Sequence, residues 1–165
     1  MVNDIARLRE DMGKTQPRMV LIGRRQLRWT NSFMHNLPAF MKGTDHCTVQ
    51  IARQDAVQLG VTEGNAVRIT SRVGSIVAPV EVTEDLMPGV MSLPHGWGHD
   101  AEGSRLQIAR ANPGVNANAL TDNQAYDAAS GTAVLFGTPV TVEPLTEGNA
   151  RNSHPTRGRV IEEQG

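Results

Sequence analysis

Two alternating apolar segments joined by a short turn constrain the fold of this 165-residue chain most strongly. The segments "AVRITSR" and "SIVAPVEV" flank Val73 and Gly74, and every second residue of the latter, from Ile76 to Val82, is apolar. This alternation places one face of a strand against a core, and a glycine-containing turn between two such runs indicates a β-hairpin. We therefore predict antiparallel strands on both sides of Val73-Gly74.

Further short strands are predicted before and after this hairpin. They are "MVLIG" (19–23), "CTVQI" (47–51), "GVMSLP" (89–94), "TAVLFG" (132–137) and "PVTVEP" (139–144). Among these strands, short helices are expected only over residues 53–59, ended by Gly60, and near residues 105–111, with a turn at Glu63-Gly64. Several short strands with few helices indicate a mainly β protein with short helices, folded as a compact barrel.

The domain organisation follows from where this pattern begins and ends. Residues 1–17 are expected to form an N-terminal helix and linker, because Ile5, Leu8 and Met12 recur at helical spacing. Residues 18–144 are assigned to the barrel. Residues 145–165 are polar and unpatterned, which favours a disordered tail. The charged residues near the N-terminus exclude a signal peptide there, and no apolar stretch is long enough to span a bilayer.

Charge and cysteine content exclude several classes of protein. The chain has 16 Lys and Arg against 17 Asp and Glu, so its surface as a whole does not attract nucleic acid or anionic membranes. Cys47 is the only cysteine, which excludes an internal disulfide and a multi-cysteine metal or iron-sulfur site. Cys47 itself is expected to be a small buried residue of a strand, and a cytoplasmic location is the simplest interpretation.

The first candidate site is "GRRQLRWTNS", in which Arg24, Arg25 and Arg28 follow Gly23 at a strand end. Guanidinium groups make charge-assisted hydrogen bonds to phosphate oxygens, and glycine allows a ligand to approach the main chain. A solvated basic loop paired with surface carboxylates would have the same composition, so both interpretations stay open.

The second candidate is "SLPHGWGHD", which holds two histidines, a tryptophan and two glycines. Gly96 and Gly98 argue against the helix that would make His95 and His99 a pair of metal ligands. A planar ligand could lie against the glycines while His95 and Trp97 stack on it or bond its edge. The alternative is a turn whose tryptophan fills the core.

The third candidate is "GVNANALTD", where Asn118 and Thr121 belong to a group of side chains suited to the polar edge of a heterocycle. Asn and Asp are also ordinary turn formers and helix caps. Ser92 lies near His95, but no nucleophile elbow surrounds it, so hydrolysis has little support.

Taken in order, four segments resemble the C-terminal dinucleotide-binding domain of molybdopterin oxidoreductases, the family of formate dehydrogenases, nitrate reductases and dimethyl sulfoxide reductase. They are "LIGRRQLRWTNSFMHNLP", "SRVGSIVAPVEVTEDLMPGVMSLPHGWGHD", "GVNANALTD" and "SGTAVLFGTPVTVEP", collinear from about residue 18 to residue 144. The resemblance implies a six-stranded double-psi β-barrel. It also implies a molybdopterin guanine dinucleotide cofactor carrying Mo or W.

The resemblance assigns cofactor-binding residues but no catalytic residue and no metal ligand. The arginines would meet the pyrophosphate, whereas the glycine-rich segment and Asn118 would meet the pterin. Phe136 stands where several family members carry a cofactor-facing lysine, so no role is assigned to it. The expected cofactor-binding residues are Gly23, Arg24, Arg25, Arg28, Thr30, Asn31, Ser32, His35, His95, Gly96, Trp97, Gly98, Asn118 and Thr121.

The resemblance covers only the last module of much longer enzymes. We expect a monomeric, non-catalytic cofactor-binding module whose partners are the upstream domains or subunit of an oxidoreductase, and a fragment is favoured over a natural short protein. The alternative from another class is a double-psi barrel that serves as a protein-interaction module, with its arginines facing acidic partners.

Overall fold

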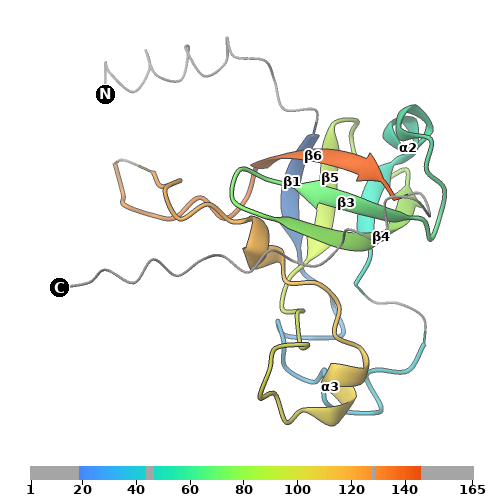
Figure 1. Cartoon of the computed structure of the whole chain (residues 1–165), viewed down its shortest axis with the longest axis vertical. Helices are drawn as coiled ribbons and strands as arrows, with labels where there is room; N and C mark the ends of the chain where they lie inside the picture. The colour runs from blue at the N-terminus through green and yellow to red at the C-terminus, as the bar shows by residue number, and fades with distance from the viewer. Residues whose placement is uncertain (1–18, 44–46, 128, 146–165) are drawn as a thin grey trace.

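A computed structural model describes residues 19–43, 47–127 and 129–145. Six strands close into a barrel in the order β1-β5-β2-β4-β3-β6. The strands are β1 (Met19–Arg24), β2 (Val49–Ala52), β3 (Ala66–Thr70), β4 (Ser75–Thr83), β5 (Val90–Pro94) and β6 (Thr138–Pro144). The closed barrel of Figure 1 is the double-psi β-barrel that the family resemblance implied. The expected terminal helix and the tail beyond Leu145 lie outside the described residues.

Two parallel pairings distinguish this barrel from a simple meander. β1 runs parallel to β5, with Val20 opposite Val90, and β2 runs parallel to β4, with Val49 opposite Val80. The other four pairings are antiparallel, including the predicted β3–β4 hairpin, in which the Ser71 N–H donates to the Gly74 carbonyl. Because β1 and β5 are parallel, the segments that follow them leave from the same end of the barrel.

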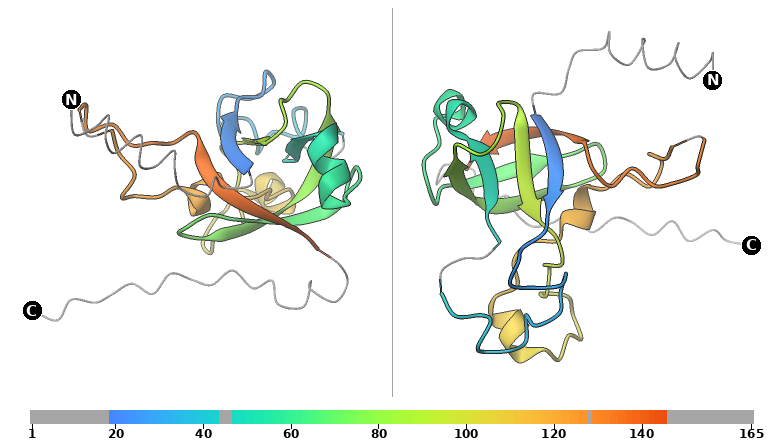
Figure 2. Two further views of the ribbon diagram at one scale, coloured as in Figure 1. Left: turned by 90° about the horizontal axis from the view of Figure 1, so that it is seen from above. Right: turned by 180° about the vertical axis from the view of Figure 1, so that it is seen from behind.

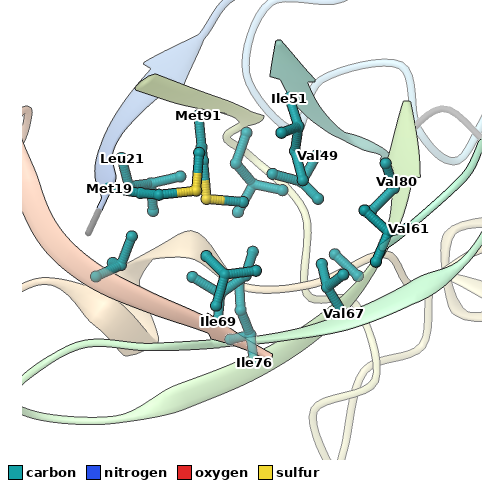
Figure 3. Close-up of a cluster of buried hydrophobic side chains, with 14 of the residues drawn as sticks. Met19, Leu21, Val49, Ile51, Val61, Val67, Ile69, Ile76, Val80 and Met91 are labelled. Carbon is teal, nitrogen blue, oxygen red and sulfur yellow. The ribbon is translucent and has the colours of Figure 1, made fainter. Parts of the chain in front are cut away.

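The barrel interior is filled by the alternating apolar residues of the strands. Val49, Ile51, Ile69 and Met91 are fully buried, and Figure 3 shows such side chains converging from several strands. Ile76, Ala78 and Val80 of β4 are buried as the sequence indicated, and Val82 packs against the same cluster. The core therefore follows from the period-two pattern.

Three short helices accompany the barrel: α2 (Arg53–Leu59), α3 (Gln107–Ala111) and the 3₁₀ helix η1 (Ala117–Leu120). α2 ends at Gly60, whose φ of +67° is left-handed, as the sequence indicated. The loops after β1 and β5 form a lobe with α3 beside the barrel (Figures 1 and 2). η1 was not foreseen, because residues 100–131 were expected to hold only one helix.

Two sequence predictions about strands were wrong. Residues 132–137 were expected to be a strand but contain only an isolated bridge between Tyr126 and Ala133, and β6 begins at Thr138. No sheet face covers this segment, and residues 131–137 are exposed. Cys47 is buried, but it precedes β2, which begins at Val49.

The segment from residue 122 to 137, hereafter the arm, projects from the barrel between η1 and β6, in orange in Figures 1 and 2. At its base the Arg72 guanidinium forms an ion pair with Asp122 through two nitrogens. The large apolar side chains Tyr126, Val134, Leu135 and Phe136 are exposed along it. An apolar, projecting arm of this kind presents a surface suited to another protein surface.

Candidate functional site

The arginine loop, residues 23–35, leaves the end of β1 and is tied down by its own side chains. Arg25 Nη1 donates to Asn31 Oδ1 at 3.2 Å, and Arg28 Nη1 donates to the Lys42 carbonyl at 3.3 Å. Both arginines are exposed. The carbonyl of Arg24 accepts from the His95 N–H at 3.3 Å, which links this loop to the residues that follow β5.

The glycine loop, residues 93–99, packs its backbone directly against the arginine loop. Gly96 has a φ of +91°, and a Cβ atom there would lie 2.5 Å from the carbonyl carbon of Asn31 and 2.8 Å from the Ser32 nitrogen. Glycine is therefore required both by the backbone conformation and by the space. The structure thus brings together the first two candidate segments, which are distant in sequence.

The asparagine loop, residues 113–121, joins the same assembly. The N–H groups of Gly98 and His99 both donate to the Pro113 carbonyl, and a Cβ atom at Gly98 would lie 2.6 Å from that of Asn116. Asn118 is exposed and Thr121 is half-buried. All three candidate segments therefore meet at one end of the barrel.

An aromatic cluster lies beneath these loops. The His35 ring stacks on Trp97 with centroids 4.1 Å apart, Trp29 meets both rings edge-on, and Nδ1 of His35 lies 2.7 Å from Nε2 of His99. His35 and Trp97 are 1% and 6% exposed. The two rings hold the loops together from within rather than presenting a face to a ligand.

The buried and the exposed residues among the expected cofactor-binding residues therefore have different roles. Gly96, Gly98 and Trp97 are occupied by chain-to-chain packing, and Gly23 is covered by the Phe136 ring, whose Cε1 would lie 2.5 Å from a Cβ atom at that position. The residues accessible to a ligand are exposed or half-buried. Those not occupied by packing between loops are Arg24, Arg25, Arg28, Thr30, Asn31, Ser32, His95, Asn118 and Thr121.

Arg24 has partners that sequence reasoning missed. Its Nη2 donates to the Thr48 carbonyl at 3.0 Å and lies 3.6 Å from Glu81 Oε2. Glu81 also accepts hydrogen bonds from the Thr48 hydroxyl and from Gln50 Nε2. The sequence signal for this group was the presence of polar residues that alternate with the core-facing residues of these strands. That signal does not say which polar residues meet, because only the parallel register of β2 and β4 brings Gln50 opposite Glu81.

The titration behaviour of this group reflects partial burial. Desolvation lowers the pKa of Arg24, and the charge of Glu81 acts against this shift. Burial alone would raise the pKa of Glu81, but hydrogen bonds from Thr48 and Gln50 and the charge of Arg24 bring it below its ordinary value. The pair is therefore ionised near neutral pH.

An open pocket of about 440 Å³ adjoins Arg24 and Arg28, a size typical of ligand sites. Its lining is Arg24, Gln26, Leu27, Arg28, Trp29, Gln50 and Glu81. A larger pocket of about 550 Å³ lies near Cys47 and Trp97, but its lining among the described residues includes no charged side chain. Of these two pockets, the one that adjoins Arg24 and Arg28 is the better site for an anion.

Metal binding and nucleophilic catalysis gain no geometric support. Within residues 19–43, 47–127 and 129–145, no three His, Cys, Asp or Glu side chains could hold a metal ion together. His99 contacts His35 through its ring, so it is not arranged as a ligand pair with His95. Ser92 is buried in β5 and is not displayed to a substrate.

A closed β-barrel whose connecting loops gather arginines and a pocket at one end defines a ligand-binding module. The chain belongs to the molydopterin dinucleotide binding domain family, whose model matches residues 19–138. Modules of this family are found in molybdenum and tungsten oxidoreductase subunits.

Curated relatives are much longer proteins. A tetrathionate reductase subunit of Salmonella typhimurium is 30% identical over 114 residues, which are 59% of this chain and 11% of that protein. The alpha subunit of F420-dependent formate dehydrogenase 2 of Methanococcus maripaludis is 33% identical over 101 residues, which are 61% of this chain and 13% of that protein. The chain thus spans about a tenth of the length of these relatives.

A solved structure shows the same fold. Acetylene hydratase from Pelobacter acetylenicus superposes with a TM-score of 0.65 at 16% identity, over 87% of this chain and 20% of that chain. Among the residues that the structure describes, no helix is both long and apolar enough to cross a membrane.

Proposed function

We propose that this chain provides part of the binding site for molybdopterin guanine dinucleotide and acts as the C-terminal module of a molybdenum- or tungsten-dependent oxidoreductase. The observation that carries the proposal is the meeting of the arginine, glycine and asparagine loops at one end of the barrel, beside the pocket that adjoins Arg24 and Arg28. The bound cofactor supplies the redox chemistry, and the chain binds and orients it.

The arginines suit the pyrophosphate of such a cofactor. Arg25 and Arg28 are exposed and precede Thr30, Asn31 and Ser32, which add neutral hydrogen-bonding groups. Guanidinium groups bond phosphate oxygens with two N–H groups at once, which also fixes orientation. Arg24 fits the same role from inside the loop, because its Nε and Nη1 atoms are buried and meet no acceptor among the described residues.

The pterin end of the cofactor fits the other two loops. His95 is half-buried and Asn118 exposed, and an amide side chain both donates to and accepts from a heterocycle edge. His35, Gly96, Trp97 and Gly98 contribute by packing the loops into one unit. We assign Thr121 to the same edge, where it ends η1.

The partner of the module is the remainder of a longer oxidoreductase subunit. The matched segments make up only about a tenth of the relatives' length, and the arm exposes apolar side chains that another domain could cover. The chain alone is therefore expected to show no turnover of formate, nitrate or sulfoxides with artificial electron carriers. Turnover by the isolated chain would contradict the proposal.

Three finer points belong to the same proposal. The guanine form of the cofactor and a metal that is either Mo or W are proposed from the resemblance of the loops to the wider family. A reducing, cytoplasmic location is proposed because the chain holds a single, buried cysteine.

The proposal is tested by nuclear magnetic resonance titration of the chain with millimolar GDP, ADP and inorganic pyrophosphate. Shifts are expected at residues 24–32 and 95–98, larger for GDP than for ADP. Arg28→Ala should weaken binding, since a charged hydrogen bond contributes roughly 1.5–3 kcal/mol. Arg53→Ala is the matched control, because Arg53 is exposed and pairs with Glu84 away from these loops.

The same titration separates the rival function. A barrel whose arginines face acidic protein partners would respond to pyrophosphate at the arginine loop, but neither nucleotide would add shifts at residues 95–98. Equal responses to GDP and ADP would contradict the guanine assignment alone.

A further inference from the structure

Glu81 lies on β4 at the end of the barrel where the arginine loop begins. It faces outward, because the neighbouring Val80 is buried and strand residues alternate between faces. β2 runs beside β4 in parallel, with Gln50 opposite Glu81, and Thr48 immediately precedes β2. This register brings three polar side chains to one outward patch below Arg24.

The patch is a connected hydrogen-bond network. Glu81 accepts from the Thr48 hydroxyl and, at 2.8 Å, from Gln50 Nε2. The Thr48 carbonyl in turn accepts from Arg24 Nη2 at 3.0 Å, and its hydroxyl lies 3.4 Å from the same nitrogen. Thr48 thus connects the carboxylate to the guanidinium by both its backbone and its side chain.

Arg24 is held by only one of its nitrogens. Nη2 makes all of its described contacts, whereas Nε and Nη1 are buried and meet no acceptor among the residues that the structure describes. Leaving buried donors unmatched costs free energy, so such donors indicate capacity for a further acceptor. The side chain is 17% exposed, so an incoming anion reaches these donors only when neighbouring groups shift.

We propose that Glu81 is a positioning residue that, through Thr48, holds the Arg24 guanidinium in place for an anionic ligand. The ligand role of Arg24 rests on the function proposed above. Glu81 itself makes no contact with the ligand in this assignment. Its carboxylate fixes Thr48 and balances the charge of a half-buried arginine whose other donors stay available.

Positioning and simple electrostatics make opposite predictions for the removal of this carboxylate. A negative charge close to an anion site weakens anion binding, so Glu81→Gln should strengthen binding if charge alone matters. If Glu81 orders Arg24, the same substitution should weaken binding, because the guanidinium must then be ordered by the ligand at an entropic cost. The sign of the effect therefore distinguishes the two.

The first experiment needs no ligand. Hydrogen exchange of the Arg24 Nε–H group is measured by magnetic resonance on the full chain, with the signal assigned by its loss in Arg24→Lys. Glu81→Gln is expected to speed this exchange about tenfold or more, which corresponds to one decade in an opening equilibrium. Unchanged exchange would overturn the proposal.

A control variant and a second test variant distinguish this result from an effect of misfolding. Glu84→Gln removes another β4-adjacent carboxylate that pairs with an exposed arginine, Arg53, and should leave the Arg24 signal unchanged. Thr48→Val keeps the carbonyl acceptor and removes only the hydroxyl, so it should also speed the exchange, although less than Glu81→Gln. If Glu81→Gln does not fold, Thr48→Val decides the question.

The second experiment titrates pyrophosphate into the single variants Arg24→Ala and Glu81→Gln and into the double variant. If Glu81 acts through Arg24, its substitution weakens binding in the wild-type background and has no effect in the Arg24→Ala background. Weakening of equal size in both backgrounds would overturn the positioning role. If Arg24→Ala leaves binding unchanged, the proposed ligand role of Arg24 fails, while the exchange experiment still decides whether Glu81 orders the guanidinium.

Discussion

Nδ1 of His35 and Nε2 of His99 lie 2.7 Å apart, and this contact joins the arginine loop to the glycine loop beneath their surface. One ring nitrogen donates a hydrogen bond to the other, so the contact is compatible with a neutral pair but not with two imidazolium ions. His35 is buried against Trp97, and burial lowers the pKa of His99, although Asp100 opposes this shift.

Stability is therefore expected to depend on pH through His99. Its pKa is ordinarily 6.5 and is lower in the folded chain, so the unfolded chain binds more protons between these two values. The free energy of unfolding should be greatest above pH 6.5 and should fall as the pH drops through the folded pKa. Urea unfolding across this range measures it. His99→Gln should flatten the dependence, and an unchanged slope in this variant would assign it to other groups.

Gly96→Ala tests the packing of the two loops. The substitution forces a side chain into a left-handed conformation and against Asn31. Gly103 has a similar φ of +85°, but a Cβ atom placed there would meet nothing within 4 Å, so Gly103→Ala carries only the conformational cost, about 1–2 kcal/mol. Gly96→Ala should cost about 1–3 kcal/mol more. Equal losses in urea unfolding would show that the loops are not in contact.

Two leucines with opposite environments test the barrel core. Leu93 is fully buried, whereas Leu27 is fully exposed beside the arginines. Leu93→Ala should reduce the free energy of unfolding by about 2–5 kcal/mol, because it removes buried methyl groups and leaves a cavity. Leu27→Ala should change it by less than about 0.5 kcal/mol. A comparable loss in both would mean that the end of β5 is not part of the core.

The arm is expected to depend on its ion pair for order rather than for global stability. Arg72→Ala removes both contacts to Asp122 at the base of the arm, and an exposed ion pair contributes little to unfolding. Limited proteolysis should therefore cut the arm faster in this variant, while thermal unfolding stays unchanged. Arg53→Ala, which breaks another exposed ion pair, should leave cleavage of the arm unaffected.

The local elements of the barrel could be predicted from the sequence, whereas contacts between distant segments could not. Alternation from Ile76 to Val82 predicted β4, and Gly60 predicted the end of α2. The segment "TAVLFG" (132–137) is equally apolar but pairs with no strand of the sheet, and β6 begins only at Thr138. A strand is defined by its pairing, and pairing is not a local property.

In the candidate site, too, local features could be predicted from the sequence, whereas contacts between distant segments could not. Three arginines after a strand pointed to an anion, and the arginine-lined pocket agrees with that interpretation. The glycines of "PHGWGH" were expected to let a planar ligand approach, which stays a prediction; what the structure shows at Gly96 is the close approach of the Asn31 backbone. A glycine in a sequence indicates that another group approaches the backbone closely. Only the structure shows whether that group is a ligand or another part of the chain.

The pairing of β1 also governs the order in which the molecule can assemble. Val20 pairs with Val90 and Met19 with Val140, so the first strand of the barrel has no partner until the last strands exist. Closing such long loops is entropically costly and makes folding slow compared with local hairpins such as β3–β4. Arg24 and His95 are therefore expected to become neighbours later than the β3–β4 hairpin forms, and a chain arrested before β1 pairs would display its arginines without a site.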